Sequence, residues 1–550
     1  MFGKEIRGMH EAAYLLAFFA LCSQLLALVR DRLLAAEFGA SHTLDLYYAA
    51  FRIPDFLFAT IASLLSLYAL LPVLTRLERE KEGYMISFLE QCLLIFFVGM
   101  GAISLVVFLL APWIVPLVVP GINDPQLVLL VRILLLQPIL LGASNILGSL
   151  TQLRHRFFLY SISPLLYNFG IIFGVIALYP HMGLAGLGWG VVLGATMHCA
   201  LQIPFFTAEK IPHRLPFKEG LREMVAVLTL SIPRTLALSA TQISLLILIA
   251  LASFFSAGSI SVFMFAYNLQ AVPLTIIGVS YSVAAFPTLA RLHAMGDHGE
   301  FVKYVETALR HIFFWCIPAT IFFIVFRAQL VRVVLGAGAF DWSATRLTAA
   351  ALALFIISLA AQSVSMLIAR AYYAAGNSKK PLYFGLSDIL ISVLSALGCL
   401  WVFQNNEFVR HFVESLLRVG DVPGTVVLVL AFGYCLGSVA EFFIGLFVFM
   451  RDFKIPRIRI SRLIFQSFSA SVIGGGVSYL FLMETGIAGT INTTGLLVLQ
   501  GACAGILGLS VTAGVLALLK NTELAESIAA FRRRFQDVRG VALETTDISS

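Results

Sequence analysis

Charged residues are scarce in this sequence of 550 residues: Asp, Glu, Lys and Arg make up only 12% of it, and apolar residues make up 59%. A soluble globular domain carries about 25% charged residues. The composition therefore excludes a chain built of soluble domains, and we expect no nucleic-acid partner. It predicts a polytopic membrane protein that contacts membrane lipids over most of its surface.

Motifs that support catalysis or metal binding are also missing. The seven cysteines stand singly, and no histidine has metal-ligand spacing to another histidine or acid, so we expect neither a disulfide framework nor a metal site. The sequence has no glycine-rich phosphate loop and no acid or histidine pair typical of a membrane transferase. We expect a transporter rather than an enzyme, with no catalytic residues and no cofactor, driven by a coupling cation or by the membrane potential.

Long apolar runs are abundant. A transmembrane helix needs about 20 predominantly apolar residues, and fourteen segments meet this requirement. They are too long for barrel strands and lack the alternation of such strands, so we expect helices. The fourteen segments are 11–37, 43–75, 86–111, 126–153, 157–178, 183–206, 221–251, 258–290, 302–326, 345–374, 381–403, 424–450, 463–482 and 492–519.

Basic residues indicate how these segments are oriented. Twenty-five Lys and Arg lie in the termini and in the connections after even-numbered segments, whereas the opposite connections hold five. The positive-inside rule therefore places both termini in the cytoplasm. The remaining seven basic residues lie within or at the ends of the segments: Arg30, Arg32, Arg52, Arg132, Arg234, Arg310 and Arg370.

Sequence landmarks recur at an offset of about 217 residues. Since this offset contains six segments, an even number, the two copies insert with the same orientation, as parallel repeats about an axis along the membrane normal. A transport site is expected between such repeats. The matching landmarks are Ser23-Gln24-Leu25 with Thr241-Gln242-Ile243, residues 69–77 with 284–292, Gly121 and Asp124 with Gly338 and Asp341, and Pro164 with Pro381.

We therefore predict an all-α polytopic membrane protein with fourteen transmembrane helices. Two parallel six-helix repeats form N- and C-lobes around a central cavity, and two further helices follow. The predicted boundaries are 1–208 for the N-lobe, 209–220 for a cytoplasmic linker, 221–452 for the C-lobe, 453–520 for the last two helices and 521–550 for a cytoplasmic amphipathic tail. Within this tail, residues 524–539 have the apolar spacing of an interfacial helix.

Three of the seven basic residues in the segments belong to the stretch 23–55, which predicts two apolar helices joined by a tight turn at 38–41. Antiparallel arms so joined pack side by side, so Arg30 and Arg52 should lie at similar membrane depth. A charge there costs roughly 2.5–3.5 kcal/mol and usually faces an internal pathway. Because guanidinium groups bind anionic oxygens through paired N–H donors, we expect these arginines to bind an anion. The alternative is a structural ion pair with Asp45 or Asp55.

The second repeat lacks this charge, since Leu248 and Ile249 stand where the first repeat has Arg30 and Asp31. Other polar residues within the segments are further candidates for the site. They are Asn268 and Gln270 for hydrogen bonding to the substrate, Gln24 and Gln242 for the polar lining of the cavity, Asp31, Asp45, Asp55 and Arg370 for gating or for orienting an arginine, and Asp388 and Glu441 for ion coupling. Interhelical hydrogen bonds are the alternative for the amides, and snorkelling is the alternative for Arg370.

Several motifs occur together in an order that resembles a known family. They are Arg30-Asp-x-x-x-Ala-x-x-Phe-Gly39, Ala50-Phe-Arg-Ile-Pro54, Ala111-Pro-Trp-Ile-Val115, Gly338-Ala-Phe-Asp341 and Arg370-Ala-Tyr-Tyr-Ala-Ala-Gly-Asn-Ser-Lys-Lys-Pro381. From about residue 10 to 385 the chain resembles the MurJ/MviN lipid II flippases of the multidrug/oligosaccharidyl-lipid/polysaccharide exporter superfamily.

The resemblance implies a bacterial inner-membrane protein that moves undecaprenyl-pyrophosphate-linked lipid II from the cytoplasmic to the periplasmic leaflet by alternating access. It implies that cavity arginines bind the pyrophosphate, that helices 13 and 14 form a groove for the prenyl tail, and that cell-wall synthesis machinery is a partner. The chain departs from the family pattern at Gln24 and Asn268, where arginines are expected, and at residues 63–68. The alternatives are a flippase for another polyprenyl-linked glycan, a cation-coupled drug exporter and a non-transporting scaffold for cell-wall assembly.

Overall fold

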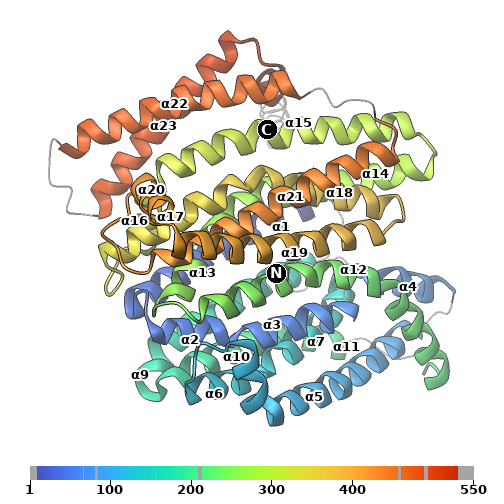
Figure 1. The fold of residues 1–550 in the computed structure, drawn as a ribbon. Helices are drawn as coiled ribbons and strands as arrows, with labels where there is room; N and C mark the ends of the chain where they lie inside the picture. Colours follow the sequence, from blue (N-terminus) through green and yellow to red (C-terminus); the bar gives the residue numbers. More distant parts are fainter. Residues whose placement is uncertain are drawn as a thin grey trace, which may run out of the picture. The chain divides into compact units, whose positions relative to one another are not determined.

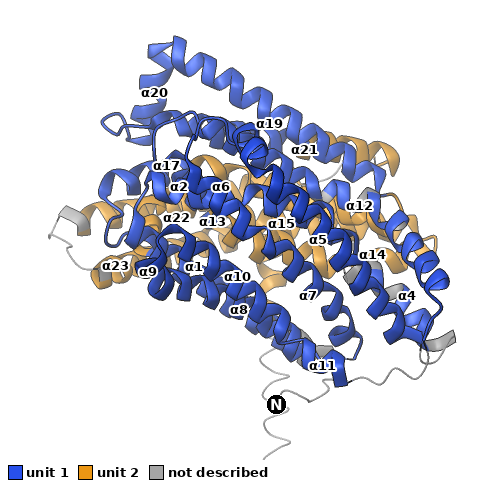
Figure 2. Ribbon diagram, turned by 90° about the horizontal axis from the view of Figure 1, so that it is seen from below, with its two compact units in different colours: residues 1–269, 334–351, 378–441 blue, residues 270–333, 352–377, 442–550 orange. Residues whose placement is uncertain are grey.

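The computed structural model describes residues 9–65, 67–80, 84–154, 156–208, 214–455, 460–487 and 494–529. All regular secondary structure in these ranges is helical, so the predicted all-α fold class is confirmed (Figure 1). The chain divides into two compact units (Figure 2). The first unit comprises residues 1–269, 334–351 and 378–441, and the second comprises 270–333, 352–377 and 442–550. The predicted lobe boundaries stay predictions.

The helices follow one another with short connections. Those up to residue 208 are α1 (Met9–Phe38), α2 (His42–Ala50), α3 (Arg52–Thr60), η1 (Ala62–Leu65), α4 (Leu67–Glu80), α5 (Tyr84–Val118), α6 (Pro125–Leu134), α7 (Leu136–Leu153), α8 (Phe157–Phe173), η2 (Gly174–Leu178), α9 (Tyr179–Met182), α10 (Leu184–Ala200) and α11 (Ile203–Ala208). Those that follow are α12 (Phe217–Ala252), α13 (Ser259–Leu274), η3 (Thr275–Val279), α14 (Ser280–Ala294), α15 (His298–Val325), α16 (Arg327–Leu335), α17 (Trp342–Ile357), α18 (Leu359–Ala374), α19 (Lys379–Asn405), α20 (Glu407–Leu417), η4 (Thr425–Val427), α21 (Leu428–Asp452), α22 (Ser461–Ile487) and α23 (Thr494–Leu518).

Most of the predicted spans coincide with long apolar helices. Within the described residues, twelve helical stretches are long and apolar enough to cross a membrane, and the bent pair α17–α18 raises the number to thirteen. Each of the thirteen overlaps one predicted segment. The segment 11–37 corresponds to α1, a helix of 30 residues that is not among the thirteen. The count of fourteen therefore stays a prediction, whereas the many-span helical architecture is confirmed.

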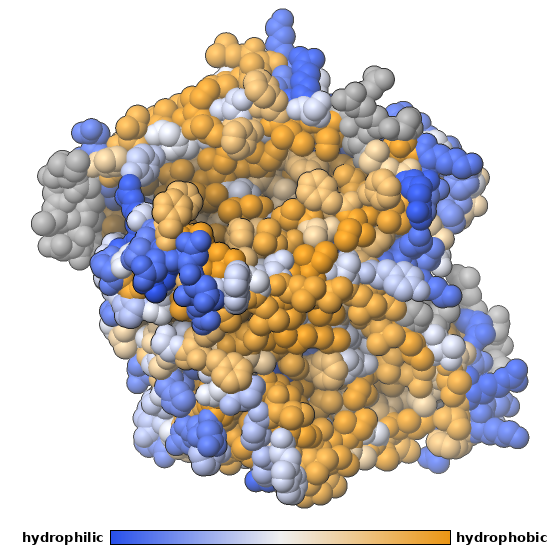
Figure 3. Space-filling model, viewed as in Figure 1, coloured by the Kyte–Doolittle hydropathy of each residue, from blue (hydrophilic) through white to orange (hydrophobic). Residues whose placement is uncertain are grey.

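The outer surfaces of these helices suit lipid rather than water. On the face shown in Figure 3, hydrophobic residues cover the sides of the helices and hydrophilic residues gather toward the helix ends. On α5, for example, Leu94, Val98 and Leu105 are more than half exposed. Such exposure would be unfavourable in water and is expected for a helix that faces hydrocarbon.

The second predicted span is not one helix but four successive pieces, from α2 to α4. The break between α2 and α3 falls at Phe51, three residues before Pro54. Proline lacks the N–H of a continuous helix and its ring clashes with the preceding turn, which favours a new helix start here. The break places Arg52 at the first position of α3 and Asp55 in its first turn, where an acid is favourable.

Two glycines that mark the repeat make equivalent close approaches within the first unit. The Gly121 N–H donates to Ser253 Oγ at 3.0 Å, and the N–H of Ala339, next to Gly338, donates to the Ala36 carbonyl at 2.8 Å. A Cβ added at Gly121 would lie 2.2 Å from the Ser253 carbonyl oxygen, and one at Gly338 would lie 2.2 Å from that of Ala36. Both partners of each contact are shifted by the repeat offset, as two parallel repeats related by a twofold axis require.

The acids that mark the repeat are helix caps. Asp124 accepts a hydrogen bond from the Gln126 N–H at 2.9 Å at the start of α6, and Asp341 accepts one from the Ala344 N–H at 2.7 Å at the start of α17. These bonds satisfy N–H groups that have no partner within the helix. The Gly-to-Asp spacing is therefore the same in the two halves because each half has a glycine at a close approach followed by an acid that caps a helix.

We expect Gly121→Ala to destabilise the protein, because the added methyl group would overlap the backbone at Ser253. Overpacking of this kind costs about 1–3 kcal/mol, and it should appear as a lower melting temperature of the purified protein in detergent. The matched control is Gly101→Ala on α5, where a Cβ would meet no described atom within 4 Å. Equal melting temperatures for the two variants would contradict the close approach at Gly121.

Candidate functional site

Arg30 and Asp31 of α1 form an ion pair with each other. Arg30 Nε and Nη2 both donate to Asp31 Oδ1, at 2.9 and 2.8 Å. Neighbouring helical residues point about 100° apart, which favoured Asp45 or Asp55 as partners; that expectation is wrong. The long arginine stem carries the guanidinium back to the adjacent carboxylate, so the pair forms within one helix.

Two asparagines from other helices complete this pair. Arg30 Nη1 donates to Asn168 Oδ1 on α8 at 3.0 Å, and Asn268 Nδ2 on α13 donates to Asp31 Oδ2 at 3.1 Å. Asn168 is itself held by the Pro164 carbonyl at 3.1 Å. The predicted candidates Arg30, Asp31 and Asn268 thus lie together, and the sequence reasoning missed Asn168. A polar amide within the apolar segment 157–178 was the signal that could have found it.

Arg52 and Asp55 form a second, looser pair at the start of α3. Arg52 Nη2 lies 3.4 Å from Asp55 Oδ2, and Arg52 Nε donates to the Tyr48 carbonyl at 3.3 Å. Gln137 of α7 donates to Asp55 Oδ1 at 3.4 Å. The Arg52 side chain is only 6% exposed, whereas that of Arg30 is 20% exposed. Of the two predicted anion ligands, Arg30 is therefore the accessible one.

Taken together, these two pairs carry no net charge, with one carboxylate for each guanidinium. Tyr47, Tyr48 and Tyr167 surround Arg30 closely enough to interact with it electrostatically. An anion that approaches Arg30 must therefore replace Asp31 as its partner rather than fill an open positive site.

Some buried polar atoms of the spans have no hydrogen-bond partner among the described residues. Neither side-chain amide atom of Gln270, which is 1% exposed, has a hydrogen-bond partner among the described residues, and the same holds for Tyr48 Oη and Gln137 Oε1. A buried group left in this state costs about 1–3 kcal/mol. Such atoms are suited to hydrogen-bond a ligand, which supports the prediction for Gln270. Its position at the end of α13 belongs to the second unit.

The hydrogen bonds that the Asp45 carboxylate accepts join it to another helix rather than to an arginine. Its carboxylate accepts hydrogen bonds from the Gly258 N–H at 2.6 Å, the Ser261 N–H at 2.7 Å and Ser261 Oγ at 2.5 Å. These donors lie at the start of α13. Asp45 is thus a cap that joins α2 to α13, which does not support its prediction as an arginine-orienting residue.

Asp388 and Glu441 lie near each other in the first unit, on α19 and α21. Asp388 Oδ1 accepts a hydrogen bond from Ser392 Oγ at 3.4 Å and also interacts with Ser438. Glu441 is half-buried and close enough to Asp388 to interact with it electrostatically. Two acids that share an apolar setting readily bind a proton or a cation.

The other predicted residues are placed without a contact that tests their roles. Gln24 on α1 and Gln242 on α12 are half-buried in the first unit, and Arg370 on α18 is half-buried in the second. Their roles stay predictions.

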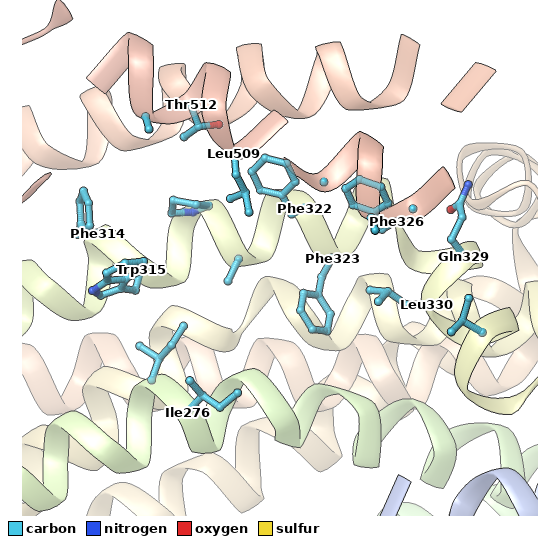
Figure 4. A pocket seen from close by; sticks show the side chains of 18 of the residues that line it. Ile276, Phe314, Trp315, Phe322, Phe323, Phe326, Gln329, Leu330, Leu509 and Thr512 are labelled. Carbon is cyan, nitrogen blue, oxygen red and sulfur yellow. The ribbon is translucent and has the colours of Figure 1, made fainter. Parts of the chain in front are cut away.

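The second unit holds an apolar groove of about 950 Å³. In Figure 4, Phe322 of α15 and Phe326, which follows that helix, lie beside Leu509 and Thr512 of α23, and Ile276 of η3 lies on the opposite side. Nearly all lining side chains are hydrocarbon, and Thr512 and Gln329 are among the few with polar atoms. The groove thus suits an extended apolar chain. Residues of α23 line it but none of α22 do, and α15 supplies much of its wall. The predicted tail groove of the last two helices stays a prediction.

An all-helical, many-span protein with paired charges inside its spans and an apolar groove is a membrane transporter, not an enzyme. The family model for lipid II flippase MurJ matches residues 34–410. The chain belongs to this family, and it is accordingly a multi-pass protein of the bacterial inner membrane.

Curated relatives agree with this assignment. A lipid II flippase MurJ from Burkholderia cenocepacia is 25% identical over 392 residues, which cover 68% of this chain and 75% of the relative. A probable lipid II flippase MurJ from Thermotoga maritima is 26% identical over 467 residues, which cover 79% of this chain and 94% of the relative.

Solved structures show the same fold. A lipid II flippase MurJ in an inward closed conformation matches with a TM-score of 0.70 at 20% identity, over 92% of this chain and 100% of that one. A multidrug resistance transporter of the MATE family, within the MOP superfamily, matches with a TM-score of 0.63 at 13% identity, over 78% of this chain and 94% of that one. The predicted superfamily fold is thus confirmed.

We expect Asp45→Ala to lower the free energy of unfolding by about 2–4 kcal/mol, because it leaves buried donors at the start of α13 without their acceptor. Thermal unfolding in detergent measures this loss. Asp124→Ala, which removes a more exposed cap on α6, is the control and should cost about 1 kcal/mol. A melting temperature for Asp45→Ala equal to that of the wild type would show that the cap does not hold α13.

Proposed function

We propose that this protein flips lipid II from the cytoplasmic to the periplasmic leaflet by alternating access, with both termini in the cytoplasm. The observation that carries the proposal is Arg30, a partly exposed guanidinium within an apolar helix, whose charged partner among the described residues is the adjacent Asp31. Membership of the lipid II flippase family supports the choice of substrate.

The pyrophosphate would bind Arg30 by exchange with Asp31. Arg30 Nε and Nη2 now both donate hydrogen bonds to Asp31 Oδ1. Two pyrophosphate oxygens would accept these two hydrogen bonds instead, as a bidentate pair. Asn168 would keep the guanidinium oriented through Nη1. Arg52, which is more buried, would support the local potential and position Asp55 rather than grip the substrate.

The prenyl tail would lie in the apolar groove of the second unit. Moving such a chain through the protein needs a surface without polar gaps, and the groove supplies one along α15 and α23. Burial of each methylene of the chain contributes about 0.8 kcal/mol, so even partial occupancy would hold the tail firmly.

Asp388 and Glu441 are the proposed coupling carboxylates. Uptake of a proton or a cation by this pair would favour one of two arrangements of the helices that carry it, and α19 and α21 approach closely where Gly437 faces Ser392. The MATE transporters that share the fold make cation coupling a reasonable parallel. The membrane potential is the alternative driving force.

We expect Arg30→Ala to abolish rescue of a bacterial strain depleted of its own lipid II flippase, because the pyrophosphate loses its bidentate ligand. The measurement is growth together with the accessibility of lipid II at the outer leaflet. Arg132→Ala is the matched control: this arginine of α6 contacts the Phe108 carbonyl and ring at the protein surface, so its loss should leave rescue intact.

The same assay separates the alternatives. Accumulation of a different polyprenyl-linked glycan on depletion would indicate another glycan flippase, and export of cationic drugs without lipid II movement would indicate a drug exporter. Rescue by Arg30→Ala with normal lipid II movement would overturn the proposed head-group site, and rescue without any lipid movement would indicate a scaffold.

We expect Asp31→Asn to bind undecaprenyl pyrophosphate about tenfold more tightly and to transport lipid II more slowly. The amide still accepts a hydrogen bond from Asn268, but it no longer competes with the substrate charge; a tenfold change corresponds to about 1.4 kcal/mol. Binding to the purified protein and transport in proteoliposomes measure the two effects. Weaker binding by Asp31→Asn would contradict the exchange of anions.

A further inference from the structure

The chain after the last transmembrane helix folds back onto the second unit. Residues 522–529 form a short helix, capped by Asn521, whose Oδ1 accepts from the Leu524 N–H at 2.9 Å. Asn521 Nδ2 donates to Gln466 Oε1 on α22 at 3.0 Å, and Gln466 Nε2 donates to the Leu519 carbonyl at 2.9 Å. The segment 519–529 is therefore pinned to α22 by reciprocal amide hydrogen bonds.

A charged clasp holds the same segment to α15. Arg310 Nε donates to Glu523 Oε1 at 2.7 Å, and Arg310 Nη2 donates to Thr522 Oγ1 at 3.2 Å. The Glu523 side chain is 3% exposed. Burial raises the pKa of Glu523, but the hydrogen bonds from Arg310, the backbone and Thr522 and the charge of Arg310 together keep that pKa below its usual value. The next residue of α15, His311, lies with its Nε2 3.3 Å from Glu526, which is one turn beyond Glu523 on the short helix.

This segment also reaches the apolar groove. Leu524 is one of the lining residues, together with Leu516 of α23 and Phe314 of α15, and Phe314 lies one turn beyond Arg310. Toward the other end the lining continues through Phe326 to Leu330 of α16. From Phe314 to Phe326 the groove follows α15 for roughly 18 Å. Leu524 thus stands at one end of the groove, with the clasp directly behind it.

We propose that residues 519–529 form the end wall of the groove and that Leu524 contacts the prenyl chain and limits the length that the groove holds. This inference rests on the proposed function, since it takes the occupant to be a polyprenyl chain. A chain that passes Leu524 would have to separate Arg310 from Glu523 and enter a polar cluster. The clasp neutralises Arg310, so this end repels hydrocarbon without offering a free cation to a phosphate.

The test compares two probes on the purified protein by native mass spectrometry: undecaprenyl phosphate, with a C55 chain, and farnesyl phosphate, with a C15 chain that ends before the wall. Leu524→Trp fills the end of the groove, so the affinity ratio of the long to the short probe should fall about tenfold. The control is Ile506→Trp on α23, at a residue that is 67% exposed and outside the groove lining; its ratio should match the wild type. An unchanged ratio in Leu524→Trp would overturn the inference.

The clasp supplies a second test that does not depend on the bulk of tryptophan. Arg310→Glu and Glu523→Arg should each release the wall, admit more of the long chain and raise the ratio. The double variant, which restores opposite charges, should reverse at least half of this rise. Failure of the double variant to reverse it would overturn the role of the clasp. If the wild type binds neither probe, the proposed function fails together with the inference. If the wild type binds both probes and the variants have the same affinity ratio as the wild type, the inference alone fails.

Discussion

A guanidinium placed inside a span is costly in hydrocarbon unless an anion neutralises it, and the structure depends on how that is done. Arg30 is paired with Asp31, Arg52 with Asp55 and Arg310 with Glu523, each within one compact unit. A buried charge without a partner is strongly unfavourable, while a pair with good hydrogen bonds is tolerated. These pairs therefore bring α1, α8 and α13 together in one unit, and α15 and the chain after α23 in the other.

The same constraint shapes transport. A site with free guanidinium groups would cost too much in an empty state, and a fully sealed ion pair could not take a substrate. Arg30 lies between these limits, because its carboxylate partner is adjacent on the same helix and its side chain stays partly exposed. In the proposed exchange, the pyrophosphate takes the place of Asp31, so the Arg30 guanidinium has an anionic partner in both states.

Much of the fold could be predicted because it follows from hydrophobic length and from landmarks with a local cause. Apolar runs of about 20 residues mark the spans, and the spacing of Gly121 and Asp124 recurs since a close approach and a helix cap are used twice. Side-chain partners could not be predicted. Asn168 lies 138 residues from Arg30, and Glu523 lies 213 residues from Arg310. Such residues come together only in the folded chain, and their spacing in the sequence does not show which way their side chains point.

Comparison of the two repeats separates the contacts that both repeats share, which are structural, from the charges that only the first repeat has. The exchanged contacts of Gly121 with Ser253 and of Gly338 with Ala36 preserve the twofold relation. The charges break it, since Leu248 and Ile249, at the positions equivalent to Arg30 and Asp31, are fully buried in the core. If Arg30 served only to hold helices together, apolar packing of the kind seen in the second repeat would do so without a desolvation cost. Retention of an exposed guanidinium in one repeat alone therefore points to a ligand with one charged end, such as an amphiphilic lipid.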